Sequence, residues 1–411
     1  MTPVRTPLEA PGLRPVAIDG DAVVELTRQL VRIRIVHDPD GGGGEAEAAA
    51  LVAATMREFG WAPELTEVAP GRPNVIATIN GGGGPGPTLA FEGHLDVVTE
   101  GDLRDWTVDP FQGLIRDGRL YGRGAADMKA GIATMLHAVR AMELQGPFPG
   151  SVRLLALADE EGMMLGAKHA AASGALAGVA GVVVCEPEGG EVCAVSKGAL
   201  RIRFELTGKM AHGAMPHQGA NPIPVLGRLI AALEELEQRV QARVGEHPLL
   251  GWTYITPTVA LAGTQEQMNV TPARASLAVD VRTVPQVDHL DLIEAMTAIC
   301  QDLSGAAGVK GEVVVVDDRP AVETSQDDPL VQCLVRAHEA VVGDRPRFGG
   351  VPGTTDGTIF TRDAGVPTVV YGPGAKWIAH QADEFVEVEE IARYAQVYAM
   401  AARAFLERGG R

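Results

Sequence analysis

Residues 152–162 read VRLLALADEEG, a short and almost wholly apolar run that ends in three consecutive acidic residues. Residues 181–187 read GVVVCEP, a second apolar run that also leads into an acidic residue. Upstream, apolar side chains recur at helical spacing between Ala130 and Leu144 and predict an amphipathic helix. Continuous apolar runs of this length, placed between helices, are typical of the buried strands of an α/β sheet. We therefore expect an α/β fold.

The middle of the chain has a different pattern. Residues 199–207 alternate apolar and polar side chains, as in a strand with one buried face. After a long amphipathic helix, the pattern predicts strands at 258–262 and 275–283, a helix at 288–303 and a strand at 312–316. This β-α-β-β-α-β order is that of the split βαβ, or ferredoxin-like, sandwich. We predict a discontinuous first domain, residues 1–196 and 317–411, interrupted by an inserted α+β domain, residues 197–316.

The composition restricts the class of protein. Among 411 residues there are 53 acidic and 35 basic side chains, a formal net charge of −18, and 46% of the residues are hydrophobic. The hydrophobic content excludes a mainly disordered chain, and the negative charge argues against nucleic acid or an anionic membrane as the main partner. No apolar run is long enough to span a bilayer, and the N-terminus has no signal-peptide pattern. Four cysteines do not make a disulfide framework, so we expect a cytoplasmic protein.

Five clusters of acidic or imidazole side chains follow predicted strands or turns, or precede the helix at Ala130. They are Glu92-Gly93-His94-Leu95-Asp96, Gly124-Ala125-Ala126-Asp127, Asp159-Glu160-Glu161, Glu186-Pro187 and Ala379-His380. The carboxyl ends of parallel strands lie along one edge of a sheet, where the ligands of open α/β folds bind. Two carboxylates ~4 Å apart repel by about 4 kcal/mol at an effective dielectric of about 20. A divalent cation removes this cost, and imidazole with carboxylate is a ligand set for zinc, manganese or cobalt.

Other kinds of site are not indicated. The stretch Gly122-Arg123-Gly124 lacks the third glycine of a dinucleotide-binding fingerprint. The sequence contains no nucleophile elbow, P-loop or His-Glu-x-x-His helix. Cys185 and Cys193 have no second cysteine pair beside them, so we interpret them as buried thiols rather than zinc ligands.

The five clusters, in this order, resemble the motifs of the co-catalytic zinc aminoacylase/carboxypeptidase family, especially acetylornithine deacetylase and succinyl-diaminopimelate desuccinylase. The resembling stretches are Gly93-His94-Leu95-Asp96-Val97-Val98, Tyr121-Gly122-Arg123-Gly124, Asp127-Met128-Lys129, Asp159-Glu160-Glu161, Glu186-Pro187 and His380. The resemblance extends from about Asp21 to Phe405. It implies a catalytic domain like that of zinc aminopeptidases, a central mixed sheet flanked by helices. The inserted domain would then be a ferredoxin-like lid and dimerisation domain.

The resemblance also implies a centre of two divalent metal ions per chain. Asp127 would bridge the two ions. His94 and Glu186 would complete the ligands of one ion, and Glu161 and His380 those of the other. Zinc is the expected metal, with cobalt and manganese as alternatives. The family's bridging aspartate commonly precedes a cis peptide bond.

The same resemblance assigns catalytic and substrate-binding roles. Asp96 would hydrogen-bond to His94 and fix its tautomer, and Glu160 would be the general base. The implied substrate-binding residues are His212, Asn269, Arg282 and Gly374. Because the family's equivalent of His212 often comes from the partner subunit, we expect a homodimer joined through the inserted domain.

One segment departs from the family pattern. Relatives carry a Pro-Ser-type segment near the first helix, where this chain reads Arg34-Ile35-Val36-His37-Asp38-Pro39. The acyl specificity is therefore open. The predicted function is hydrolysis of the amide bond of a small N-acylated amine, with an N-acyl amino acid as the expected substrate. The alternatives are a dipeptidase or carboxypeptidase, a deformylase of a non-amino-acid amine such as a formylaminopyrimidine, and a metal-binding scaffold without activity.

Overall fold

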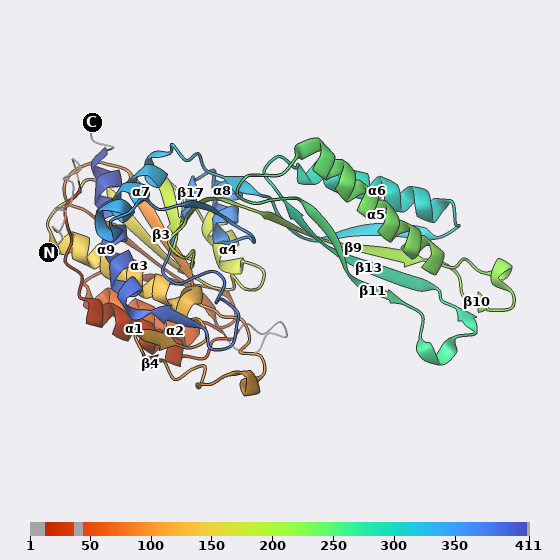
Figure 1. Ribbon diagram of the computed structural model, residues 1–411, viewed down its shortest axis with the longest axis horizontal. Helices are drawn as coiled ribbons and strands as arrows, with labels where there is room; N and C mark the ends of the chain where they lie inside the picture. Colours follow the sequence, from red (N-terminus) through yellow and green to blue (C-terminus); the bar gives the residue numbers. More distant parts are fainter. Residues whose placement is uncertain (1–12, 37–43, 409–411) are drawn as a thin grey trace, which may run out of the picture. The chain divides into compact units, whose positions relative to one another are not determined.

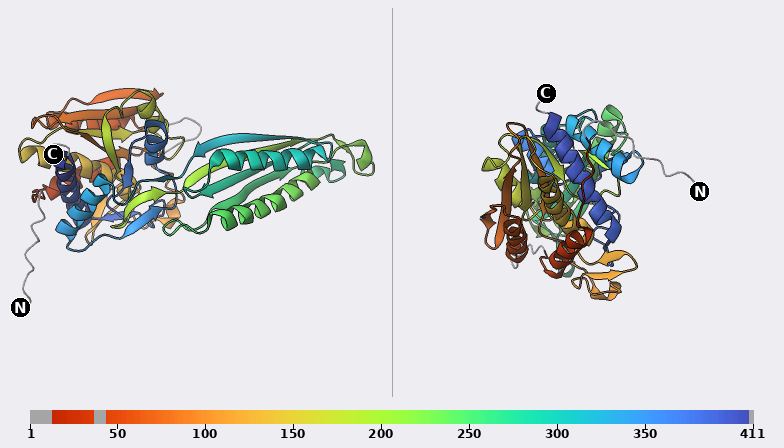
Figure 2. Two further views of the ribbon diagram at one scale, coloured as in Figure 1. Left: turned by 90° about the horizontal axis from the view of Figure 1, so that it is seen from above. Right: turned by 90° about the vertical axis from the view of Figure 1, so that its left-hand side faces the viewer.

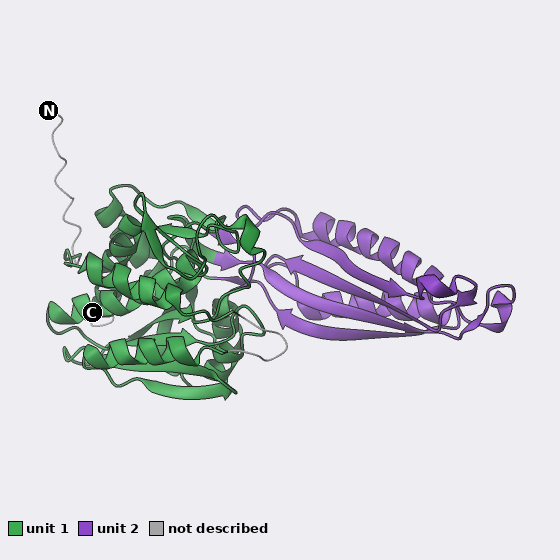
Figure 3. Ribbon diagram, turned by 90° about the horizontal axis from the view of Figure 1, so that it is seen from below, with its two compact units in different colours: residues 1–194, 324–349, 355–411 green, residues 195–323, 350–354 purple. Residues whose placement is uncertain are grey.

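The computed structural model describes residues 13–36 and 44–408, which divide into two compact units. Unit 1 combines the chain up to Ala194 with Thr324–Gly349 and the chain from Thr355 onward. Unit 2 consists of Val195–Glu323 and Gly350–Thr354 (Figure 3). Most of unit 2 is thus one continuous insertion into unit 1.

A mixed sheet forms the centre of unit 1, as predicted. Strand β3 pairs in parallel with β6 and β7, and β17 also pairs in parallel with β7. Strand β2 is antiparallel to β1 and β6, and β8 is antiparallel to β17. The strands lie in the order β1-β2-β6-β3-β7-β17-β8. Their bounds are β1 (Glu64–Ala69), β2 (Arg72–Asn80), β3 (Thr88–His94), β6 (Ser151–Leu157), β7 (Val179–Val184), β8 (Val192–Ser196) and β17 (Thr368–Val370).

Helices cover both faces of this sheet. Phe91 of β3 packs on Tyr398 of α9, with ring centroids 5.1 Å apart. Successive side chains of a strand point to opposite faces, so Glu92 points the other way, where it lies against Asp356 of α8. Figure 1 shows α3 and α9 beside each other on one side of β3. The helices of unit 1 are α1 (Gly20–Arg32), α2 (Ala46–Glu58), α3 (Ala130–Leu144), α4 (Leu165–Ala172), α7 (Pro329–Val342), α8 (Asp356–Ala364) and α9 (Val388–Arg408).

Aspartates cap several helices at the positions where the sequence changes from loop to helix. Asp19 accepts a hydrogen bond from the amide of Ala22 at the start of α1, at 3.1 Å. Asp328 does the same for α7 at 2.8 Å, directly before Pro329 in the first turn. Such caps satisfy amides that have no partner inside the helix, and proline is tolerated there because it lacks an amide proton.

Unit 2 has the predicted β-α-β-β-α-β order. Its antiparallel sheet has the strand order β11-β13-β9-β14. Figures 1 and 2 show α5 and α6 side by side on one face of this sheet. The apolar residues of β9 alternate with partly or fully exposed ones, as the sequence pattern predicts. The bounds are β9 (Gly198–Thr207), α5 (Ile223–Val244), β11 (Tyr254–Ala262), β13 (Arg274–Thr283), α6 (His289–Gly305) and β14 (Lys310–Arg319).

Several short elements were not predicted, because two to five residues are too few to show a periodic pattern. Strands β18, β5 and β4 form a small sheet in unit 1, and β10 pairs with β12 in unit 2. The short strands are β4 (Leu114–Arg116), β5 (Arg119–Tyr121), β10 (Ala211–His212), β12 (Val270–Thr271), β15 (Val322–Glu323), β16 (Phe348–Val351) and β18 (Phe385–Glu387). The short helical turns are η1 (Leu103–Asp105), η2 (Ala125–Lys129), η3 (Pro216–Gln218) and η4 (Gln265–Gln267).

Each unit has its own hydrophobic core. In unit 1 the core lies between the sheet and the layer of α1, α3, α7 and α9, and Ile132 and Leu136 of α3 are fully buried in it. In unit 2 the core lies between the sheet and α5 and α6, around Phe204 and Leu229. Within residues 13–36 and 44–408, no helix is long and apolar enough to cross a membrane.

Two helical glycines give opposite predictions for the same substitution. A Cβ atom on Gly131 of α3 would lie 2.2 Å from the carbonyl oxygen of Cys185, whereas a Cβ atom on Gly227 of α5 would meet nothing within 4 Å. We expect Gly131→Ala to lower the free energy of unfolding by about 2 kcal/mol through overpacking. Gly227→Ala should raise it by about 0.5–1 kcal/mol, because glycine is a poor helix former.

Urea unfolding followed by circular dichroism measures both changes, with Gly227→Ala as the matched control. Equal or greater stability of Gly131→Ala would show that α3 does not pack against the end of β7 this closely.

Candidate metal centre

The predicted clusters meet at one edge of the unit 1 sheet. Strands β3, β6 and β7 are parallel neighbours, so their carboxyl ends lie side by side. His94 ends β3, Glu160 and Glu161 follow β6, and Glu186 follows β7. Two further predicted ligands come from elsewhere in unit 1. Asp127 lies in η2 directly before α3, and His380 lies in the loop between β17 and β18.

The carboxylate of Asp127 lies between two imidazoles. Its Oδ1 atom is 3.0 Å from Nε2 of His94, and its Oδ2 atom is 3.2 Å from Nε2 of His380. Glu186 Oε1 lies 3.3 Å from the same nitrogen of His94, and Glu161 Oε1 lies 3.1 Å from that of His380. The five predicted ligands therefore form two groups that share Asp127.

The hydrogen bonds of His94 make its group suitable for a cation. Nδ1 of His94 lies 2.9 Å from the main-chain oxygen of Asp96, which can only accept a hydrogen bond. In the neutral ring Nδ1 therefore carries the proton, and Nε2 presents a lone pair to oxygens of Asp127 and Glu186. A lone pair directed at carboxylate oxygens is stabilised by a positive ion among them. Ligand atoms of His94, Asp127 and Glu161, and of His94, Glu160 and Glu186, lie within 4.8 Å of one another.

The protonation of these side chains indicates the same need for positive charge. Burial raises the pKa of Glu186 to about 8, and repulsion by Asp127 adds to this. Burial alone would lower the pKa of His94, but attraction to Glu186 and hydrogen bonds to Asp127 hold it well above its usual range. Hydrogen bonds to Asp127 and Glu161 raise the pKa of His380 to about 10. Protons thus compensate the negative charge wherever no other cation does.

Asp96 and Glu160, the two predicted catalytic acids, lie beside the predicted ligands. The carboxylate of Asp96 accepts hydrogen bonds from the amides of Glu160 and Glu161, at 3.1 and 3.2 Å. Its Oδ1 atom is 3.5 Å from Nδ1 of His94, so the shorter contact to His94 is the one from the main chain. Burial raises the pKa of Glu160 well above its ordinary value; His94 opposes this effect and Glu161 adds to it. Asp96 therefore joins the end of β3 to the turn that carries Glu160.

One buried acid near the centre was missed by the sequence analysis. Glu384 is fully buried, and its Oε1 atom accepts hydrogen bonds from the amides of Ala126 and Asp127, at 3.0 and 3.1 Å. Its Oε2 atom pairs with Arg123, whose guanidinium lies 5.3 Å from the ring centre of Trp106. Glu384 thereby holds the backbone that carries Asp127. Nothing in the sequence indicated that Glu384 is buried, because it follows Asp383 and two adjacent acidic residues usually lie in solvent.

The peptide bond between Asp127 and Met128 is cis, as the resemblance implies. Gly374, a predicted substrate-binding residue, lies in the loop that carries His380. Its amide donates to Oε2 of Glu390 at 3.3 Å, and its carbonyl accepts from the amide of Gly189 at 2.8 Å. The departing segment begins in the described chain at Arg34, but His37-Asp38-Pro39 lies outside the described residues.

The other predicted substrate-binding residues belong to unit 2. His212 of β10 pairs with Val270 of β12, and the amide of Gly213 donates to the carbonyl of Asn269 at 2.7 Å. His212 and Asn269 are therefore neighbours, and the His212 side chain is exposed. Arg282 lies on β13, where its Nε atom donates to Oδ2 of Asp280 at 2.8 Å.

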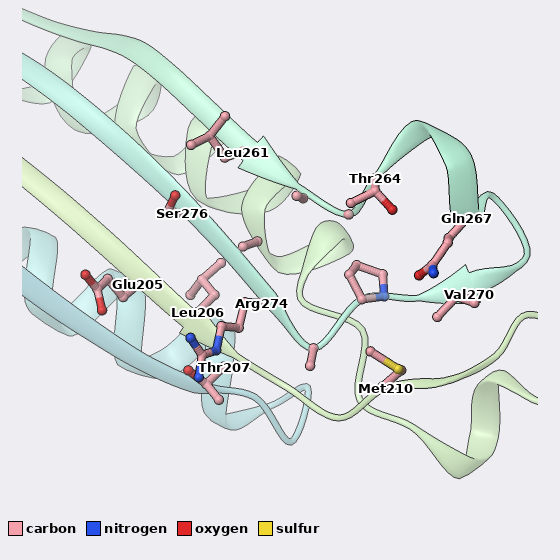
Figure 4. Close-up of a pocket in the computed structure, with 15 residues that line it drawn as sticks. Glu205, Leu206, Thr207, Met210, Leu261, Thr264, Gln267, Val270, Arg274 and Ser276 are labelled. Carbon is pink, nitrogen blue, oxygen red and sulfur yellow. The ribbon is translucent and has the colours of Figure 1, made fainter.

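A groove of about 820 Å³ lies in the same unit, over strands β9, β11 and β13 (Figure 4). Met210, directly before β10, and Val270 of β12 line one end of it. Leu261 on the edge strand β11 and Arg274 on β13 line the rest, so the groove presents both apolar and charged side chains.

Comparison with known proteins identifies the family. The model of peptidase family M20/M25/M40 matches residues 90–404. The chain belongs to this family. M20 peptidases are metal-dependent hydrolases of amide bonds, so the predicted class of enzyme is confirmed. The match spans both the ligand clusters and the inserted unit.

Named relatives of this M20 chain cover nearly its whole length. It is 32% identical to a succinyl-diaminopimelate desuccinylase from Gluconacetobacter diazotrophicus, over 99% of each chain. It is 28% identical to a probable succinyl-diaminopimelate desuccinylase from Staphylococcus epidermidis, over 94% of this chain and 98% of the other. These matches confirm the predicted resemblance to the deacylases of the family.

Solved structures of M20 proteins share the fold. The M20 family metallo-carboxypeptidase from Sulfolobus solfataricus matches with a TM-score of 0.77 and 20% identity, over 93% of this chain and 99% of the other. A dinuclear metal-binding M20 peptidase from Bacillus subtilis matches with a TM-score of 0.70 and 19% identity, over 94% and 98%.

Binding of a cation to the metal-free protein should release protons at pH 7. Without a cation, His94 and His380 should be protonated, since their pKa values are raised, and so should Glu186, whose pKa is about 8. Ligand imidazoles must be neutral and ligand carboxylates ionised, so we expect at least about one proton released per Zn²⁺ bound. Calorimetric titration in buffers of different ionisation enthalpy measures this number.

His380→Ala should reduce the number of protons released, whereas the exposed His217→Ala in unit 2 should leave it unchanged. A binding enthalpy that does not depend on the buffer would contradict the prediction.

Proposed function

We propose that the protein is a deacylase of N-acyl amino acids that binds two divalent cations. The observation that carries this proposal is the position of Asp127, each of whose carboxylate oxygens faces a separate imidazole and carboxylate pair. His94 and Glu186 would hold one cation, Glu161 and His380 the other, and Asp127 would bridge them. Zinc fits this donor set, with cobalt and manganese as alternatives. The desuccinylase relatives support the acyl amino acid as substrate.

Glu160 is proposed as the general base. When bound, the two cations polarise the substrate carbonyl and lower the pKa of the attacking water. The Glu160 carboxylate accepts a proton from this water and then donates it to the nitrogen of the leaving amine. The amide C–N bond breaks as the new C–O bond is completed, so the products are a carboxylate and an amine. A raised pKa suits a group that must both take and return a proton.

Unit 2 is proposed to be the lid and dimerisation domain. His212 and Asn269 would bind the carbonyl or acyl part of the substrate, and Arg282 its carboxylate, since a guanidinium pairs well with carboxylates. Gly374 would contribute the backbone of its loop. The substrate is thus a small molecule, with no role for nucleic acid or membrane. The four buried free thiols support a cytoplasmic location, where cysteines stay reduced.

A homodimer through unit 2 is supported by the surface of its edge strand. β11 lies at one edge of the sheet, and Val259 and Leu261 on it are exposed. Exposed apolar side chains on an unpaired edge are usually covered by another chain.

The substrate class is tested by an amine-release screen. N-acetyl, N-succinyl and N-formyl amino acids, dipeptides and a formylaminopyrimidine are compared, each with zinc, cobalt and manganese. Turnover of N-acyl amino acids above all other classes is the expected result. Preference for dipeptides or for the formylaminopyrimidine would indicate one of the alternative functions, and no turnover at all would indicate a scaffold.

Glu160→Gln should lower kcat by at least about 10³-fold while the metal content stays near that of the unchanged protein, because the amide cannot accept a proton. Glu58→Ala, an exposed acid of α2, is the matched control and should keep full activity. Metal analysis by mass spectrometry accompanies the kinetics. Full activity of Glu160→Gln would refute the base assignment.

Leu261→Lys should convert the dimer to a monomer and lower kcat, because a charge on the edge strand opposes association. Leu144→Lys, at an exposed leucine of α3 in unit 1, is the control and should remain a dimer. Sedimentation velocity separates the two states. A fully active monomer of the unchanged protein would contradict the proposed dimer.

A further inference from the structure

His380 differs from the other proposed ligands in its surroundings. Its side chain is 53% exposed, compared with 12% for Asp127 and 10% for Glu186. It lies on a loop rather than at the end of a strand or helix, and its φ angle is +66°. The position of this loop must therefore be set by contacts outside the metal centre.

The first part of the His380 loop is held by the connection between β7 and β8, which carries Glu186. The amide of Tyr371 donates to the carbonyl of Val184 at 2.9 Å. The amide of Gly189 donates to the carbonyl of Gly374 at 2.8 Å. These backbone hydrogen bonds end at Gly374, before the segment that reaches His380.

Beyond Gly374, Lys376 joins the two loops through ion pairs. Its Nζ atom lies 2.7 Å from Oε2 of Glu188 and 2.9 Å from Oε2 of Glu191. Both carboxylates belong to the connection between β7 and β8. The Glu188 side chain is 4% exposed and that of Lys376 is 32% exposed, so this ion pair is partly shielded from solvent.

The ammonium group of Lys376 lies among side chains of the kinds that bind metal ions, two glutamates and a cysteine. Ligand atoms of Glu188, Glu191 and Cys193 lie within 4.8 Å of one another. Cys193 donates to Oε2 of Glu188 at 3.1 Å. Since Lys376 already supplies positive charge to both carboxylates, this cluster connects two loops rather than holding a metal.

We infer that Lys376 is a positioning residue, which clamps the loop of His380 to the loop of Glu186 and so sets the ligand geometry of the second cation. The inference rests on the proposed two-cation site. Without the ammonium group, the ion pairs that attract the His380 loop to the connection between β7 and β8 would be lost, so the His380 loop would be held less firmly. Cation binding at His380 and Glu161 would then weaken, while binding at His94 and Glu186, whose side chains follow strands, would change little.

Calorimetric titration of metal-free protein with Zn²⁺ tests this inference. The unchanged protein should bind Zn²⁺ in two steps. Lys376→Met should lower the affinity of one step about tenfold, a loss typical of removing a group that supports a metal ligand. The affinity of the other step should stay within about twofold. Lys376→Arg should recover most of the lost affinity. Lys310→Met, which removes an exposed lysine paired with Glu312 in unit 2, is the control and should change neither step.

Glu191→Gln provides a second variant that keeps the shape of the side chain and leaves Lys376 paired with Glu188. It should weaken the same step by about threefold, and it decides the question if Lys376→Met does not fold. For Lys376→Met, kcat should recover as the Zn²⁺ concentration is raised, with KM unchanged.

The inference would be overturned if Lys376→Met weakened both binding steps equally or weakened neither. If Lys376→Met does not fold, the same outcomes in Glu191→Gln would overturn it. The titration uses no substrate, so it distinguishes failure of the clamp from failure of the proposed deacylation. A single binding step in the unchanged protein would contradict the two-cation proposal itself.

Discussion

The carboxylate of Asp127, set between the imidazoles of His94 and His380, is the interaction on which the rest of the centre depends. Each imidazole also meets one further carboxylate, so negative charge gathers in a largely buried place. Such an arrangement is costly unless positive charge compensates it. Cations satisfy this requirement, and the same cations supply the polarisation that hydrolysis of an amide needs. The demand for positive charge and the proposed chemistry therefore have one physical origin.

The centre is supported by buried polar contacts that fix its backbone rather than its ligand atoms. Glu384 accepts hydrogen bonds from the amides of Ala126 and Asp127. Asp96 accepts hydrogen bonds from the amides of Glu160 and Glu161. Lys376 connects the loops that carry the proposed ligands Glu186 and His380 through its ion pairs. Buried charges of this kind hold a geometry strongly, because removing one partner leaves the other uncompensated. The ligands themselves remain available to the cations.

Function also depends on how the chain is divided. Unit 1 carries every proposed metal ligand, whereas His212, Asn269 and Arg282 belong to unit 2. Each unit has its own hydrophobic core, so each keeps its own internal geometry. The proposed roles therefore place substrate recognition and bond cleavage in separate parts of one chain. If these roles are correct, substitutions in unit 2 would alter the substrate range and leave the proposed ligands in place.

The amino-acid sequence was enough to predict the local features, because periodicity and motifs are properties of neighbouring residues. These features are the buried strands between helices, the β-α-β-β-α-β insertion and the five clusters. Because parallel strands present their carboxyl ends together, the sequence also predicted that the acids and the imidazole at strand ends meet. The grouping of Asp127 and His380 with them came from the resemblance to the family. Three other features became visible only in the folded chain. Asp96 contacts His94 most closely through its main chain, Glu384 is buried, and Lys376 joins two loops. An isolated acid or lysine looks the same in the sequence whether it lies in solvent or in the core. Its energy is set by neighbours that are distant along the chain.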